Sequence, residues 1–154
     1  MRTCSNPKIL VITSRKRFEG EADFLKQIEK IAAAKPFGIV LREKDLSVKE
    51  YSELARKVRD ICRSAGASLI VHSHPEVARE LGVSALHMPL DALEKLSSEE
   101  RKEFEVLGAS CHSVEDALRA KALGCDYVTA GHVYATDCKP GLPPRGADFL
   151  AEVC

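Results

Sequence analysis

The segment AGHVYATDCKPGLPPRG, residues 130–146, holds side chains that can bind an anion or a polar ring. It combines the hydroxyl of Thr136 with the cations Lys139 and Arg145, and prolines and glycines stiffen and turn the chain around them. Hydroxyl and ammonium groups both donate hydrogen bonds to anions. We therefore predict that Thr136 and Lys139 bind an anion, the alternative being a solvated turn.

Polar residues also follow other apolar runs, at Arg42–Lys44, His72–His74, His87 and Ser110–His112. His112 is suited to proton transfer because histidine titrates near neutral pH, although a surface histidine beside a helix cap at Ser113 is the alternative. Arg42 and Lys44 could bind an anion, or could form exposed ion pairs with Asp45 that contribute little to stability.

The other histidines and the six cysteines do not form a metal-binding pattern. Cys111 and His112 are neighbours on a predicted strand, so their side chains point to opposite faces. We predict no metal site, reduced cysteines that serve as small apolar residues, and solvated strand-end positions for His72, His74 and His87.

These residues lie between elements that alternate regularly along the chain. Apolar runs predict strands, and apolar residues at helical spacing predict helices, one of which begins with a capping box at Ser47 and Glu50. The predicted strands are 8–14, 38–44, 68–74, 84–90, 105–112 and 125–134, and the predicted helices are 21–34, 47–66, 75–82, 91–104 (broken around 96–98), 113–124 and 147–154.

Continuous apolar strands that alternate with amphipathic helices predict an α/β fold with parallel strands covered by helices. In such folds ligands bind at the carboxyl ends of the strands, where the polar residues named above gather. Residues 1–154 contain no linker or low-complexity tract, so we expect a single domain. The periodicity fits either an open doubly wound sheet or six-eighths of a barrel.

The composition excludes several classes of partner. The chain has 23 Lys and Arg and 23 Asp and Glu, so its neutral balance gives no electrostatic reason to bind nucleic acid or anionic lipid. No apolar run is long enough to span a membrane, and the N-terminal segment resembles a first strand rather than a signal peptide. The expected location is cytoplasmic.

Three segments resemble one known family. VLREKDLS (40–47), GASCHS (108–113) and AGHVYATDCKPGLPPRG (130–146) are similar to motifs of the thiamin phosphate synthases and their TenI-type relatives, in the same order and spacing. The last segment is closer to the TenI-type proteins. The resemblance implies a TIM-barrel-like fold with about six of the eight (β/α) units, a truncated or incomplete barrel.

The resemblance also implies thiamin biosynthesis and a thiazole or pyrimidine phosphate as the small-molecule ligand. The leading hypothesis is a TenI-type tautomerase, an isomerase that shifts a proton on a thiazole carboxylate phosphate with His112 as acid and base. The first alternative is a synthase that joins a pyrimidine pyrophosphate to a thiazole phosphate. Carried over by resemblance, Arg42, Lys44, Thr136 and Lys139 lie on the pyrophosphate side and Ser110 near the pyrimidine.

Two departures from the family pattern count against the synthase. His72 and Ser73 stand where the family has Asn-Asp, and Pro89-Leu90-Asp91 replaces a segment that carries a second metal carboxylate. Magnesium prefers carboxylate and phosphate oxygens, so we expect no cofactor, with magnesium only if the protein is a synthase. A non-catalytic family remnant that acts as a ligand-binding or regulatory module is the third hypothesis. The first and last predicted strands would both be sheet edges, which predicts a homo-oligomer.

Overall fold

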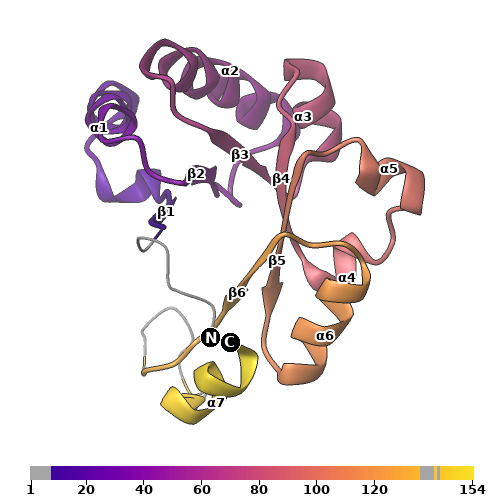
Figure 1. Ribbon diagram of the computed structural model, residues 1–154. Helices are drawn as coiled ribbons and strands as arrows, with labels where there is room; N and C mark the ends of the chain where they lie inside the picture. Colours follow the sequence, from indigo (N-terminus) through magenta and orange to yellow (C-terminus); the bar gives the residue numbers. More distant parts are fainter. Residues whose placement is uncertain (1–7, 136–140, 142) are drawn as a thin grey trace. The chain divides into compact units, whose positions relative to one another are not determined.

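A computed structural model describes residues 8–135, 141 and 143–154, and shows a chain made of two compact units, Met1–Leu86 and His87–Cys154 (Figure 1). Both units alternate parallel strands with helices. This α/β organisation is the one that the hydrophobic periodicity predicts.

In the first unit the strands are neighbours in chain order, and Figure 1 shows the helices covering one face of them. Both pairings are parallel, with Leu10 opposite Gly38 and Ile39 opposite Leu69. The elements of this unit are β1 (Leu10–Ile12), the 3₁₀ helix η1 (Arg15–Arg17), α1 (Glu21–Ala33), β2 (Gly38–Leu41), α2 (Val48–Ala65), β3 (Leu69–His72) and α3 (Pro75–Leu81).

Local sequence explains where α2 begins and ends. The Ser47 hydroxyl accepts from the Glu50 backbone N–H, while the Glu50 carboxylate accepts from the Ser47 N–H, which is a complete capping box. The helix ends at Gly66, whose φ of 67° lies in the left-handed region that glycine adopts without steric cost. All residues of β2 and β3 are buried, as expected for strands with apolar side chains on both faces.

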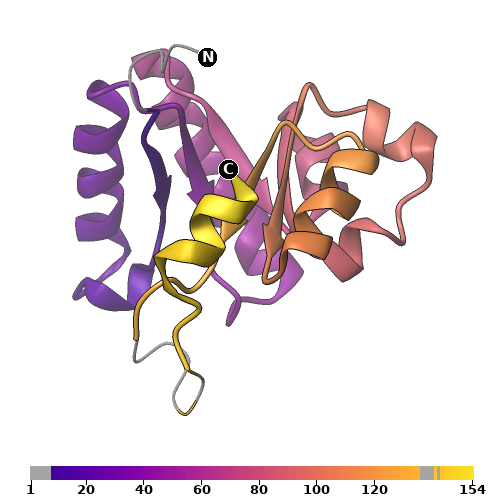
Figure 2. The same cartoon turned by 60° about the horizontal axis from the view of Figure 1, so that its bottom comes forward.

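The second unit also has its strands in chain order. β5 and β6 are parallel, with Gly108 opposite Tyr127 and Ser110 opposite Thr129, and α6 contacts α7. In Figure 2, α6 is orange and α7 is yellow. β4 begins in the last residues of the first unit. The elements are β4 (Ala85–Pro89), α4 (Leu90–Leu93), α5 (Ser98–Lys102), β5 (Val106–Cys111), α6 (Val114–Ala122), β6 (Tyr127–Ala130) and α7 (Gly146–Val153).

The strands are shorter than the apolar runs predict, mainly because polar residues at the ends of the runs leave the sheet. The predicted break at residues 96–98 is confirmed, since Ser97 caps a separate helix, α5. The 3₁₀ helix η1 was not predicted. The sequential strand order within each unit favours the barrel over a doubly wound sheet, in which the strand order reverses at a switch point.

Two further predictions concern surfaces. Within the described residues, no helix combines the length and the apolar character needed to cross a bilayer. Ile9 and Ile12, at β1, are 66% and 49% exposed. An exposed apolar edge is compatible with association between copies, and the homo-oligomer stays a prediction.

Candidate functional site

A buried carboxylate, Glu43, ties together the strand ends of the first unit. Only 4% of Glu43 is exposed. Its carboxylate accepts from the Thr13 hydroxyl at 2.5 Å and from the Arg15 backbone N–H at 3.0 and 3.1 Å. The Thr13 hydroxyl in turn accepts from the Arg42 backbone N–H at 3.0 Å. These hydrogen bonds offset the cost of burying the charge and fix the chain after β1 against the chain after β2.

The predicted anion-binding cations lie on either side of this anchor. Arg42 and Lys44 are both exposed at the end of β2, with buried Glu43 between them in the sequence. The alternative for Arg42 and Lys44 is an ion pair with Asp45. The Asp45 carboxylate lies 2.5 Å from the Arg15 guanidinium. Glu43 thus positions the backbone of the two cations, and sequence reasoning missed it. The signal that could have indicated Glu43 is a single acid between two basic residues at the end of an apolar strand.

The end of β3 is also buried and hydrogen-bonded. His72 is 4% exposed, and its Nδ1 lies 2.8 Å from the Ser73 hydroxyl. The Tyr51 hydroxyl accepts from the His72 backbone N–H and donates to the carbonyl oxygen of Leu41, so it bridges the ends of β3 and β2. Burial raises the pKa of the Tyr51 phenol, which keeps it protonated as a donor.

In the second unit a buried histidine lies at the centre of a hydroxyl network. His87 is 3% exposed. Its Nδ1 lies 3.0 Å from the Tyr127 hydroxyl and its Nε2 lies 2.9 Å from the Ser110 hydroxyl, which also accepts from Thr129 at 3.3 Å. The prediction that His72 and His87 are solvated is therefore wrong, because hydrogen bonds to neighbouring hydroxyls satisfy the buried imidazoles.

Gly108 makes room for this network on β5. A Cβ atom at this position would lie 2.2 Å from a ring carbon of Tyr127 and 2.6 Å from Nδ1 of His87. No side chain other than hydrogen fits there without displacing the ring. The glycine of the GASCHS segment is thus explained by the close approach of two polar rings.

His112, the predicted acid–base residue, is exposed just after β5. Its backbone N–H donates to the Asp116 carboxylate at 2.8 Å, and its Nδ1 lies 3.1 Å from the carbonyl oxygen of Gly131. A carbonyl oxygen only accepts, so Nδ1 carries a hydrogen and, in the neutral ring, Nε2 is an acceptor. Cys111 beside it is buried, which confirms that the two side chains point to opposite faces.

Asp116 holds the His112 loop. Burial raises the pKa of its carboxyl, but hydrogen bonds from the Arg119 guanidinium, the His112 N–H and the Ser113 hydroxyl outweigh burial, and the pKa is lowered. The Ser113 side chain caps α6 by accepting from the Asp116 N–H. His112 is therefore a surface histidine beside the helix cap at Ser113, as the alternative in the sequence analysis states. This position is compatible with a hydrogen bond to Nε2 of His112.

Thr136 and Lys139 lie outside the described residues, so their anion-binding role stays a prediction. The chain on either side is hydrogen-bonded: the Arg145 N–H donates to the carbonyl oxygen of His132, and the Gly146 N–H donates to that of Val133, both at 3.0 Å. The start and the end of the 130–146 segment are therefore held together.

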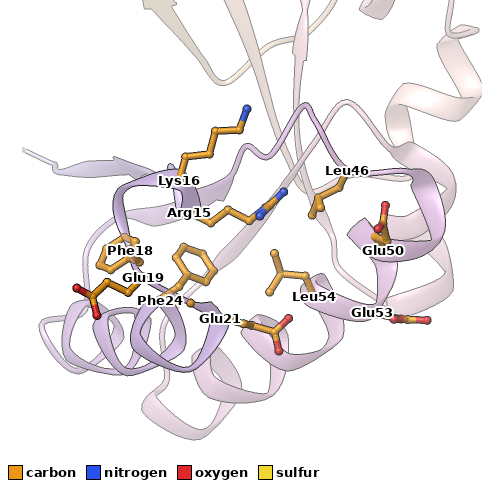
Figure 3. A pocket seen from close by; sticks show the side chains of 11 residues that line it. Arg15, Lys16, Phe18, Glu19, Glu21, Phe24, Leu46, Glu50, Glu53 and Leu54 are labelled. Carbon is orange, nitrogen blue, oxygen red and sulfur yellow. The ribbon is translucent and has the colours of Figure 1, made fainter.

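A separate pocket of about 320 Å³ lies in the first unit beside η1, α1 and α2 (Figure 3). Phe18, Phe24 and Leu54 provide apolar walls, and Arg15 reaches across one side. Several of its polar groups serve the fold: Arg15 pairs with Asp45, Glu21 with Lys57, and Glu50 caps α2. None of the residues predicted to bind the ligand lines this pocket.

Comparison with known proteins decides the family. The sequence profile described as thiamine monophosphate synthase, which includes the TenI-type proteins, matches residues 9–154. The thiamine-phosphate synthase of Caldanaerobacter subterraneus is 31% identical over 151 residues, which cover 94% of this chain and 68% of that protein. The chain belongs to the thiamine monophosphate synthase family.

Further relatives agree on the family. The bifunctional thiamine biosynthetic enzyme TH1 of Arabidopsis thaliana is 34% identical over 121 residues, covering 75% of this chain and 22% of the plant protein. The solved structure of thiamine phosphate pyrophosphorylase from Pyrococcus furiosus superposes with a TM-score of 0.74 at 26% identity, covering 95% of this chain and 68% of that one. The predicted TIM-barrel-like fold is thereby confirmed.

The residues at the ends of β3 and β4 do not fit a protein-held magnesium ion. His72 and Ser73 are hydrogen-bonded to each other after β3, and Asp91, the acid of the Pro89-Leu90-Asp91 segment, is exposed. Among the described residues, no group of three or more His, Cys, Asp or Glu side chains could hold a metal ion. Magnesium prefers carboxylate and phosphate oxygens, and the absence of a cofactor stays a prediction.

Proposed function

We propose that the protein performs transferase chemistry of the thiamine-phosphate synthase type, joining a pyrimidine pyrophosphate to a thiazole phosphate with release of pyrophosphate. The observation that carries this proposal is the match to proteins named thiamine-phosphate synthase over nearly the whole chain. The comparisons favour this alternative and give no specific support to the tautomerase, which the sequence analysis places first.

The first unit supplies charge for the leaving group. Arg42 and Lys44 are exposed cations on a backbone that buried Glu43 anchors. A guanidinium and an ammonium group bind pyrophosphate oxygens by charge-assisted hydrogen bonds and stabilise the negative charge that develops as the pyrophosphate leaves. By family resemblance, Thr136 and Lys139 are also expected to bind pyrophosphate.

The second unit supplies groups for the pyrimidine and for proton transfer. Ser110 is half-buried on β5 and carries a hydroxyl held by His87 and Thr129, which suits hydrogen bonding to a ring. A specific observation also keeps the tautomerase as a second candidate: the contact of His112 Nδ1 with the Gly131 carbonyl leaves Nε2 to accept and return a proton.

The test is formation of thiamin phosphate from the two substrates, measured by chromatography with and without magnesium. We expect product from the wild type and a roughly 10- to 100-fold lower kcat/KM for Arg42→Ala, because a charge-assisted contact to the departing anion is lost. Arg56→Ala is the matched control, since Arg56 is an exposed arginine of the same unit that pairs with Glu80.

Two results would contradict the synthase. If the wild type forms no thiamin phosphate but aromatises the thiazole carboxylate phosphate, the tautomerase is the function. If neither reaction occurs while a pyrimidine phosphate still binds, the non-catalytic ligand-binding hypothesis replaces both.

A further inference from the structure

We propose that His87 and Tyr127 are positioning residues that make Ser110 an obligate hydrogen-bond donor toward the ligand. None of these contacts involves the exposed His112. The inference rests on the proposed function only for the identity of the ligand, a ring that presents an unprotonated acceptor nitrogen. The direction of the hydrogen bonds within the network does not depend on it.

The direction starts at Tyr127. Burial raises the pKa of its phenol, so the hydroxyl keeps its hydrogen throughout the physiological range. The Tyr127 hydroxyl lies 3.0 Å from Nδ1 of His87 and can donate to it. A neutral imidazole that accepts at Nδ1 carries its hydrogen on Nε2, and that nitrogen lies 2.9 Å from the Ser110 hydroxyl. In this tautomer His87 donates to Ser110.

Ser110 then receives two hydrogen bonds. Besides the one from His87, Thr129 donates to the same oxygen at 3.3 Å from the neighbouring strand. A hydroxyl has two acceptor lone pairs and one hydrogen, so an oxygen that accepts twice has only its hydrogen left to offer. A ligand at this strand end must present an acceptor, such as a ring nitrogen without hydrogen, and an N–H at the same place would be rejected.

The backbone is shaped to admit this contact. A Cβ at residue 108 would lie 2.5 Å from the Tyr127 hydroxyl, so glycine at that position allows the phenol to reach His87. The opposite direction is chemically possible and has the opposite consequence. With the hydrogen on Nδ1, Ser110 would donate to Nε2 and could no longer donate to a ligand. The tautomer of His87 decides between the two.

The first experiment reads the tautomer from ¹⁵N-labelled histidine by nuclear magnetic resonance of the full chain at neutral pH. We expect His87 in the Nε2–H form in the wild type. Tyr127→Phe keeps the ring but removes the donor, and we expect a mixture of tautomers. Tyr134→Phe is the matched control, because Tyr134 lies in the same unit, is 77% exposed and should leave the His87 signals unchanged. An Nδ1–H or doubly protonated His87 in the wild type overturns the proposal.

The second experiment measures coupling between the residues in binding of the pyrimidine monophosphate by calorimetry. Ser110→Ala and Tyr127→Phe should each weaken binding roughly 5- to 20-fold, as expected for one lost hydrogen bond. The double variant should bind about as weakly as Ser110→Ala alone, because Tyr127 acts through Ser110. Additive losses would overturn the positioning role. An Nε2–H tautomer together with no binding by the wild type would leave the network standing and refute the proposed ligand.

Discussion

Glu43 in the first unit and His87 in the second are both buried polar residues beside strand ends, yet they organise their surroundings in different ways. The Glu43 carboxylate only accepts, so it gathers donors from Thr13 and from the Arg15 backbone. The His87 imidazole can both donate and accept, so it connects Tyr127 to Ser110. A carboxylate, which only accepts, fixes the position of the chain. A neutral imidazole that accepts at one nitrogen donates at the other, so it also decides which of its neighbours acts as donor.

This difference separates two kinds of contribution to a site. The first unit offers exposed cations on an anchored backbone, which suits binding of charge. The second offers a directed hydroxyl and an exposed histidine, which suits ring recognition and proton transfer. Changes of Arg42 should therefore lower kcat/KM for the pyrophosphate substrate, changes of Ser110 should weaken binding of the ring, and changes of His112 should lower kcat.

The largest expected effect concerns proton transfer in the second unit. His112→Asn keeps a polar side chain but cannot exchange a proton near neutral pH, so any aromatisation of the thiazole should fall about 10²- to 10⁴-fold in kcat. His74→Asn is the control, because His74 lies at the N-terminal end of α3 beside Glu76. Equal rates for His112→Asn and the wild type would show that this part of the second unit takes no part in proton transfer.

A glycine substitution compares the packing of the two units. In Gly108→Ala the new methyl group would meet the Tyr127 ring and His87, and we expect a loss of about 2–3 kcal/mol in the free energy of unfolding. Gly38→Ala would meet Cδ1 of Ile70, the end of a flexible side chain, and should cost about 1 kcal/mol. Urea unfolding measures both. Equal losses would mean that the polar network is no more rigid than an apolar contact.

The anchoring carboxylate of the first unit can be tested by Glu43→Gln. The amide removes the charge and places an NH₂ group where two donors converge, so we expect a loss of about 2 kcal/mol in the free energy of unfolding. Glu53→Gln, at an exposed position of α2, should change it by no more than about 0.5 kcal/mol. A neutral effect at Glu43 would remove the proposed anchor of Arg42 and Lys44.

The smallest expected effect is a pH dependence in the second unit. The pKa of Asp116 is lower in the folded protein than in the unfolded chain, so its contribution to stability is present above the unfolded value of about 3.9 and is lost as the pH falls through the folded value. Because the side chain is partly solvated, we expect about 0.5 kcal/mol. Asp116→Asn should be less stable than the wild type at pH 7 and equally stable near pH 2, by thermal unfolding. A constant difference across this range would contradict the assignment.

The sequence determined the order of elements because their signals are local. The capping box at Ser47, the break before Ser98 and the alternation of apolar runs with helices each depend on residues that are near one another in the chain. Local signals also placed Arg42, Ser110 and His112 at strand ends. The C-terminal ends of the strands were predicted several residues too far along the chain. The apolar pattern does not show at which polar residue the chain leaves the sheet.

Only the tertiary structure decided what these residues touch. His87 looked like a solvated histidine, since nothing in its neighbourhood in the sequence shows that Tyr127, 40 residues later, comes to its Nδ1. Nothing near Glu43 in the sequence shows that Thr13, 30 residues earlier, donates to its carboxylate. Burial and hydrogen-bond partners depend on which strands become neighbours. The direction of a hydroxyl or the tautomer of a histidine follows from those long-range contacts, because residues near in sequence do not supply the donors and acceptors.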